Sequence, residues 1–583
     1  MTTRKPQRTS GDDLLPWIVP GAALLIGTLF FGAWLGGTLG AAVSGAGWHP
    51  PPFGLSTLAT LVKEGPAEVW PTASMTALAA GMSTVFGGVV AGVVVLIMLV
   101  RHRVAGPTGL AGRKELAGLL PKGAAERSRQ LRPSLAKLGK LEADDTGNLL
   151  GNLDPNGPEL RSSYEDVELD LMAPRAGKST SIAVPRVLRA RGSVLLTSNK
   201  ADVYSVTRAE RERVGRIWTF DPQGIAHTPR TLWWDMLADA STIEGARRLA
   251  GHFVGAVNDD ASKRDFWISA AQNTLTALFH AANRGKRQVG EVLAWLADPA
   301  DRTPVDLLRD AGMAALADQL QGTVQGAVET RDGIYETARQ CVACLLDPGI
   351  AAWVTPDPDL PQFLPSHHVL SRDTLYLLSK DGGGSAAGVI AAAADSVLRA
   401  GVVAAERMGG RLDPPMTAVL DEAANVCRIS DLPDLYSHFG SRGINIVTLL
   451  QSYRQGTRVW GEAGMDALWG AATIKLLGAG LDDADFVEKV SRLVGEHDVS
   501  TVSYSKSKDG RSRSTSYRLE RILPADRIRA LPKGTALLLA TGIKPALVKL
   551  RPWYADPGAD RIATAAQAEV KAITARAAEG IIR

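Results

Sequence analysis

Two long apolar stretches dominate the pattern of hydrophobic and polar positions near the start of the chain. Residues 14–62 and residues 69–100 contain no Asp, Glu, Lys or Arg. Each stretch exceeds the roughly 20 apolar residues that a helix needs to cross a bilayer. The pattern therefore predicts two transmembrane helices, near residues 17–43 and 75–100.

Cationic residues indicate how these helices are oriented. The loop between the spans has Lys63 as its one cation, whereas five cations precede the first span or follow the second: Arg4, Lys5, Arg8, Arg101 and Arg103. By the positive-inside rule both termini face the cytoplasm, and about 30 residues lie outside. A cleavable signal peptide, with small residues after it at 42–46, is the alternative for the first span.

Small residues recur four positions apart along both spans. They are Gly32, Gly36, Gly40, Gly88 and Gly92. This spacing permits close helix packing, either within one chain or between subunits.

Strand-like alternation begins after the spans, at Val167, Leu169 and Leu171, and leads through a loop of small residues into a helix-like run. The backbone N–H groups of such a loop and the helix dipole can hold a triphosphate, with a lysine on the β- and γ-phosphates and a serine on Mg²⁺. The stretch predicts a site for a nucleoside triphosphate and Mg²⁺, which is ATP in the family named below, formed by Ala173, Pro174, Arg175, Ala176, Gly177, Lys178, Ser179 and Thr180.

The match to the phosphate-loop pattern is incomplete at one position. The pattern G-x-x-x-x-G-K-[ST] begins with glycine, but Met172 stands there. A plain loop entering a helix is the alternative, and Met172 leaves nucleotide affinity open.

A second element lies some 240 positions further along the chain. The run MTAVLDEAAN predicts a buried strand that delivers Asp421 and Glu422 to the carboxyl edge of a parallel sheet, where such sheets bind ligands. In phosphate-loop enzymes such an aspartate holds Mg²⁺, here together with Ser179, and an adjacent glutamate polarises the attacking water. An apolar strand before Asp-Glu is a weak signal alone, but combined with Gly-Lys-Ser it predicts an ATPase.

Two further residues flank the predicted strand 444–450. Gln451 follows it, beside Asp421 if the strands are neighbours, and can sense the γ-phosphate or orient water; a polar strand cap is the alternative. Arg442 precedes it and can reach a neighbouring subunit's nucleotide as an arginine finger, or be a surface arginine.

Buried strands alternating with helical runs predict an α/β fold with a mostly parallel sheet, and helical periodicity without β-branched runs predicts an all-α insertion. The expected segments are a membrane anchor at 1–103, a basic linker at 104–160, a nucleotide-binding domain at 161–234 and 366–555, the insertion at 235–365, and a helical tail at 556–583. The linker suits anionic lipid headgroups, and direct DNA contact is its alternative.

Composition adds little that is specific. A net charge of +4 is too mild to identify a nucleic-acid binder, and three cysteines fit a reducing compartment. Cys341 and Cys344 lack the four ligands of a zinc site, so buried thiols are expected. The serine-rich, basic ribbon at 499–517 predicts a hairpin, either solvated or in contact with nucleic acid.

These motifs together resemble the type IV secretion coupling proteins of the TraG/TraD class, the membrane-anchored ATPases of bacterial conjugation. The resemblance covers most of residues 15–555. It is carried by the two spans, the APRAGKS loop, the SNKADVY turn, the helical insertion, LDEAAN, and GSRGINIVTLLQS with a second glutamine at Gln455.

The resemblance implies a recombinase-like phosphate-loop fold and a homohexamer with nucleotide at the subunit interfaces. It implies single-stranded DNA with an attached relaxase as substrate, recruited by the insertion and passed to a type IV secretion channel. It also implies a multi-pass protein of the plasma or inner membrane with a large cytoplasmic domain.

Three other functions fit parts of the pattern. A double-stranded DNA translocase shares the fold, although it usually has more spans and a C-terminal winged domain. A protein-secretion ATPase is favoured by tandem phosphate loops, and the sequence has one. A non-catalytic membrane scaffold is motivated by Met172.

Overall fold

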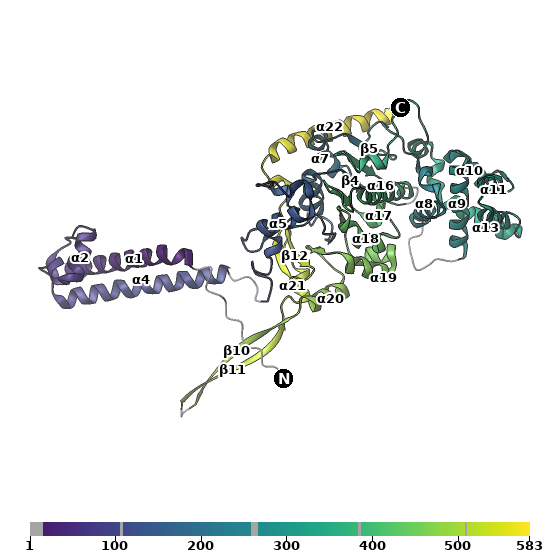
Figure 1. Cartoon of the computed structure of the whole chain (residues 1–583). Coiled ribbons are helices and arrows are strands. Elements are labelled where there is room, and N and C mark those ends of the chain that lie inside the picture. The colour runs from purple at the N-terminus through teal and green to yellow at the C-terminus, as the bar shows by residue number, and fades with distance from the viewer. Residues whose placement is uncertain (1–14, 105–108, 258–265, 383–385, 508–509, 583) are drawn as a thin grey trace. The chain divides into compact units, whose positions relative to one another are not determined.

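The structure is a computed structural model that describes residues 15–104, 109–257, 266–382, 386–507 and 510–582 (Figure 1). The chain divides into two compact units, Met1–Gly106 and Pro107–Arg583. We call them the N-terminal unit and the C-terminal unit and describe each by itself.

The N-terminal unit is built on two long helices, α1 (Leu15–Ala41) and α4 (Met75–Val104), which lie side by side. A π-helical turn (Ala42–Ala46) and the short helices α2 (Leu55–Lys63) and α3 (Pro66–Val69) connect them. Two windows are apolar and long enough to span a membrane: Gly27–Ala46, which covers the end of α1 and the π-helical turn, and Met75–Gly92 within α4.

Glycines allow α1 and α4 to approach backbone to backbone. A Cβ atom on Gly36 would lie 2.6 Å from the Met82 Cα, and one on Gly40 would lie 2.3 Å from the Ala77 carbonyl oxygen. The spacing of small residues on α1 therefore serves packing within the chain. A Cβ atom on Gly88 would instead meet nothing within 4 Å.

An eleven-stranded sheet forms the centre of the C-terminal unit, in the order β2-β1-β13-β12-β9-β3-β8-β7-β4-β6-β5. The strands from β9 to β5 in this order pair in parallel, and the remaining pairs are antiparallel. Their bounds are β1 Asn148–Leu153, β2 Glu159–Ser162, β3 Glu168–Leu171, β4 Val194–Ser198, β5 Ile217–Phe220, β6 Thr374–Leu378, β7 Met416–Leu420, β8 Ile444–Leu450, β9 Ile474–Leu477, β12 Thr535–Ala540 and β13 Ala546–Lys549.

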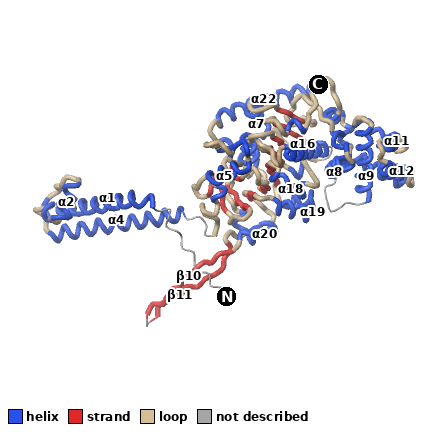
Figure 2. The backbone as a smooth tube through the Cα atoms, viewed as in Figure 1, coloured by secondary structure: helices blue, strands red, loops and turns tan. Residues whose placement is uncertain are grey.

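Helices cover both faces of this sheet (Figure 2). One core contains side chains of α6 (Val184–Arg189), α7 (Asp202–Glu212) and α22 (Ala559–Ile582). The other core contains side chains of α16 (Ala387–Arg407), α17 (Ala423–Val426), α18 (Leu432–Ser441), α19 (Tyr453–Ala471), α20 (Ala484–Val494) and α21 (Ala525–Arg529). Helix α16 is apolar enough to span a membrane but is largely buried, which explains its composition.

The predicted all-α insertion contains helices and no described strand. It comprises α8 Ile243–Val257, α9 Phe266–Arg284, α10 Val289–Ala297, α11 Thr303–Asp310, α12 Ala314–Val324, α13 Val328–Cys341 and α14 Pro348–Ala351, with α15 Pro365–His368 leading back to the sheet. The predicted hairpin forms a separate ribbon of β10 (Glu496–Ser507) and β11 (Gly510–Arg521).

The structure differs from the sequence prediction inside the expected linker. Helix α5 (Pro121–Leu131) and strands β1 and β2 lie within or across 104–160, and β1 pairs with β13 from the far end of the chain. Asn148, Gly151 and Asn152 interrupt the hydrophobic alternation of β1, which is why the pattern indicated no strand there.

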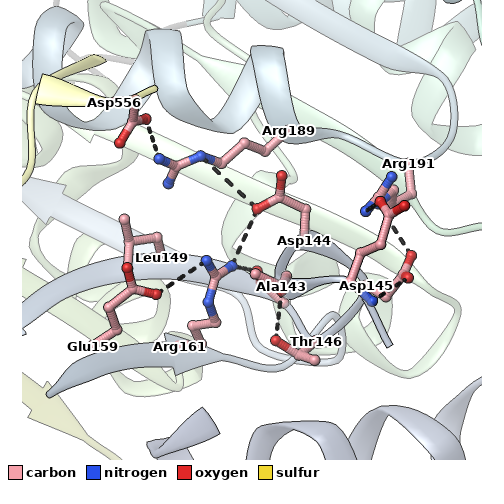
Figure 3. Close-up of polar contacts among 12 residues, drawn as sticks. Ala143, Asp144, Asp145, Thr146, Leu149, Glu159, Arg161, Arg189, Arg191 and Asp556 are labelled. Atoms are coloured by element: carbon pink, nitrogen blue, oxygen red, sulfur yellow. Dashed lines mark hydrogen bonds and ion pairs between the residues drawn. The ribbon is translucent and has the colours of Figure 1, made fainter. Parts of the chain in front are cut away.

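Ion pairs fix the end of this linker to the helix that follows the phosphate loop (Figure 3). Asp144 accepts from Arg161 at 3.3 Å and lies 3.9 Å from the Arg189 guanidinium on α6. Arg189 also pairs with Asp556, at the start of the C-terminal tail. The linker, the helix after the loop and the tail therefore meet at one polar cluster.

Candidate active site

The phosphate loop follows β3, as the sequence predicts. Gly177 has φ +104° and Arg175 has φ +62°, so two left-handed residues turn the chain sharply before Lys178. The Ala176 N–H donates to the Ala173 carbonyl at 3.2 Å, and the Ser181 N–H donates to the Gly177 carbonyl at 2.9 Å. The loop is thus a closed turn entering a helix.

The helix after the loop begins irregularly. Its first turn is π-helical, Ser179–Ala183, and α6 follows directly. The Val184 N–H donates to the Ser179 carbonyl five residues earlier, and Pro185, which follows, has no N–H to donate.

The two predicted acidic residues lie at the carboxyl end of β7. Glu422 adopts a left-handed conformation, with φ +54° and ψ +41°, which is uncommon for a residue with a side chain. The Lys178 ammonium lies 3.4 Å from the Glu422 Oε1, and both side chains are buried. Residues 244 positions apart therefore meet in one site.

Asp421 lies beside this pair and is almost completely buried. The Ser198 hydroxyl donates to its Oδ2 at 3.4 Å. Burial and the neighbouring Glu422 carboxylate raise the pKa of Asp421 to about 7, and Lys178 opposes that rise. The ionised carboxylate is thus short of positive charge, a shortage that a divalent cation would relieve.

Gln451 joins the same site from the end of β8. Its amide donates to both carboxylate oxygens of Glu422, at 2.8 Å each. Asn425 also donates to Glu422, at 3.2 Å, and Gln455 bridges Asn425 and the Gln451 backbone at 2.9 Å each. Glu422 is therefore held by hydrogen bonds on two sides.

Two of these groups, Asn425 and Ser198, were not among the predicted site residues, and Gln455 was named only in the family resemblance. Both belong to stretches quoted for the family resemblance, LDEAAN and the SNKADVY turn. Ser198 is the last residue of β4 and Asn425 lies on α17, four residues after Asp421, so both follow strands towards the carboxyl edge, and that position could have indicated them.

Arg442 lies away from the site formed by Lys178, Glu422 and Gln451. It precedes β8, whose seven residues extend about 23 Å at the usual rise per residue, and Gln451 follows the opposite end of that strand. Its guanidinium donates to Glu406 on α16 at 3.0 Å. Within one chain it does not join the site, and its role towards a neighbouring subunit stays a prediction.

Met172 occupies the position of the missing first glycine, but its side chain is part of the core. It is 0% exposed, and its N–H donates to the Leu450 carbonyl at 3.2 Å. A Cβ on Gly478, across from it, would lie 2.5 Å from the Met172 Cγ. The large Met172 side chain after β3 therefore packs against Gly478 after β9, where only a residue without a side chain leaves room for it.

Met172→Ala is expected to lower the free energy of unfolding by about 2–5 kcal/mol, because it leaves a cavity against Gly478. Urea unfolding of the purified protein measures this. Gly478→Ala tests the same contact from the other side and should also destabilise. A Met172→Ala protein of unchanged stability would contradict this packing role.

The donor set suits a nucleotide-bound Mg²⁺ rather than a metal held by protein alone. Among the residues that the structure describes, no three His, Cys, Asp or Glu side chains are grouped to bind a metal ion. Mg²⁺ usually takes one or two protein oxygens plus phosphate oxygens and waters. Ser179 and Asp421 supply oxygens of that kind.

One protein family matches part of the chain. Residues 415–533, which include β7, β8 and the β10–β11 ribbon, match the family described as "TraG-D_C: TraM recognition site of TraD and TraG". The comparison with curated proteins gave no significant match.

Solved structures of one conjugative coupling protein share the fold. The unbound monoclinic form of TrwBdeltaN70 matches with 20% identity and a TM-score of 0.52, over 69% of this chain and 88% of that one. Its trigonal form with sulphate matches with 20% identity and a TM-score of 0.52, over 72% and 92%. TrwB in complex with ADP and Mg²⁺ matches with 19% identity and a TM-score of 0.50, over 69% and 89%.

Proposed function

We propose that this chain, which resembles the type IV coupling proteins in its matched family region and its fold, is a membrane-anchored ATPase that moves DNA into a conjugation channel. It recruits DNA with an attached relaxase and drives transfer through a type IV secretion system. Two membrane spans hold it in the plasma or inner membrane, with both termini and the large C-terminal unit in the cytoplasm.

One observation carries the proposal. Lys178 on the phosphate loop, Asp421 and Glu422 after β7, and Gln451 after β8 converge at one edge of a parallel sheet. This arrangement of four side chains from three distant parts of the sequence supports roles in phosphate binding, Mg²⁺ binding and water activation.

The contacts suggest how the residues act in turn. Without nucleotide, Lys178 neutralises Glu422. A bound triphosphate draws the ammonium towards its β- and γ-phosphates, which frees the Glu422 carboxylate to accept a proton from the attacking water. Gln451 and Asn425 keep that carboxylate oriented, and Gln451 thereby registers whether the γ-phosphate is present. Ser179 and Asp421 would hold Mg²⁺, which would offset charge on the phosphate oxygens when bound.

The remaining assignments rest on the resemblance. The helical insertion is the recruiting domain for the relaxase-bound substrate. The active form is a homohexamer, in which Arg442 approaches the nucleotide of the next subunit as an arginine finger. Its partly exposed side chain is compatible with that role.

Purified protein should hydrolyse ATP, and single-stranded DNA should raise the rate more than duplex DNA of equal length. Phosphate release with each DNA measures this. Stimulation by duplex alone would favour a double-stranded DNA translocase, and stimulation by protein substrate without DNA would favour a protein-secretion ATPase. Binding of ATP without turnover would favour a non-catalytic scaffold.

A further inference from the structure

The segment that connects α1 and α4 folds back along α1. The indole Nε1 of Trp34 donates to the Pro51 carbonyl at 2.8 Å. The ring of Phe53 stacks on Phe30 with centroids 4.8 Å apart, and it lies edge-on to Trp34 at 5.5 Å. Because Trp34 and Phe30 precede the last residue of α1 by 7 and 11 residues, the segment descends about 10–16 Å along the helix.

This descent takes the segment to the depth of a bilayer interior. Gly32 faces Val89 of α4, so the contacted part of α1 lies level with residues near 86–91 of α4. These residues are about 15–22 Å from Arg101, the first charge after the span, at the usual helical rise. The hydrocarbon core is about 30 Å thick, so Phe53 lies about 8–15 Å inside the outer boundary when Arg101 marks the inner one.

The backbone of the segment suits an apolar environment. Pro50, Pro51 and Pro52 are consecutive and have no N–H group that would need a hydrogen-bond acceptor. The carbonyls of Pro51 and Pro52 accept from the Trp34 indole and the Thr57 hydroxyl. Irregular backbone in hydrocarbon is costly because its polar groups lack partners, and the three prolines and these two hydrogen bonds reduce that cost.

The side chains of the segment also suit an apolar environment. Trp48 is 55% exposed, Phe53 57% and Leu55 85%, although they are large and apolar. The Lys and Glu residues of the connection come later in the sequence, at Lys63, Glu64 and Glu68. In water this apolar surface would be unfavourable, whereas lipid would cover it.

We propose that residues 48–55, which we call the proline wedge, re-enter the outer leaflet beside α1 and contact lipid acyl chains. The proposal rests on the two-span anchor of the proposed function. It removes the eight residues of the wedge from the roughly 30 residues that would otherwise lie outside the membrane. Lipid replaces water as the surroundings of Trp48, Phe53 and Leu55.

Cysteine labelling of the full chain tests the wedge and the topology separately. Cys341, Cys344 and Cys427 are first replaced by serine, and single cysteines are then introduced as Phe53→Cys, Leu55→Cys and, as the control in the same connection, Glu64→Cys. Right-side-out membrane vesicles receive a membrane-impermeant maleimide. Glu64→Cys should label rapidly, and both wedge variants should label many times more slowly.

A second measurement identifies what protects the wedge. An environment-sensitive fluorophore on Phe53→Cys or Leu55→Cys, in liposomes containing only this protein, should be quenched by lipids that carry a nitroxide on the acyl chain. Labelling as fast as Glu64→Cys overturns the proposal, and so does protection without lipid quenching, which would indicate contact with protein. Failure of Glu64→Cys itself to label from outside would instead overturn the two-span topology.

Discussion

ATP hydrolysis is expected to fall by about 10²-fold or more in both Lys178→Ala and Glu422→Gln, the range found when a catalytic proton acceptor or a charge-stabilising group is removed. Lys178 is the one cation that contacts Glu422 in the described structure, and in the proposed function it binds the phosphates. Glu422→Gln keeps the size and the hydrogen bonding of the side chain but cannot accept a proton from water.

The two variants should differ in binding. Lys178→Ala removes a phosphate contact and should weaken ATP affinity, whereas Glu422→Gln should bind ATP and retain it. Phosphate release and equilibrium nucleotide binding separate these outcomes. Glu244→Gln makes the same exchange at an exposed carboxylate of α8 and should leave turnover unchanged. Undiminished hydrolysis in both site variants would refute the assignment.

The strands that carry the site were predictable because each is encoded in one local pattern. The apolar runs that form β4, β7 and β8 have the bounds that their composition indicates, since strands buried on both faces read as continuous hydrophobic stretches. The motif residues follow these strands directly. Parallel pairing of β3, β8 and β7 then brings Lys178, Gln451 and Glu422 to one edge.

Other features depend on contacts between distant segments and had no local signal. The hydrogen-bonded chain from Gln455 through Asn425 to Glu422 exists because the first turn of α19 lies next to α17. The burial of Met172 depends on a glycine some 300 positions later. The pairing of β1 with β13 likewise joins two distant segments, and the local sequence of each gives no indication that the other is its neighbour.

A buried ion pair beneath the phosphate loop gives the largest expected effect on stability. Arg186 of α6 donates to Glu168 of β3 through two nitrogens, at 2.6 and 3.1 Å, and both side chains are about 1% exposed. Arg186→Met should lower the free energy of unfolding by about 3–5 kcal/mol, because it leaves the Glu168 charge buried without a partner. Urea unfolding of the purified protein measures the loss.

Asp170 supplies the matched control, since it is buried on the same strand. Burial, and then the charge of Glu168, raise the pKa of Asp170 well above its usual range, while Arg186 opposes the rise. The Asp170 carboxyl therefore loses its proton at a lower pH in the unfolded chain than in the folded protein. As the pH rises above about 4, ionisation favours the unfolded chain, and the free energy of unfolding falls. Asp170→Asn should remove that pH dependence and cost little at neutral pH.

The Arg186–Glu168 ion pair also joins β3 and α6, the two elements that the phosphate loop connects. Glu168 lies on the strand before the loop and Arg186 on the helix after it, so their bond fixes the loop at both ends. Arg186→Met should therefore weaken ATP binding even at temperatures where the protein stays folded, and Asp170→Asn should not. Equal ATP affinity in a folded Arg186→Met protein would mean that the loop keeps its shape through its own turn, formed by Arg175 and Gly177.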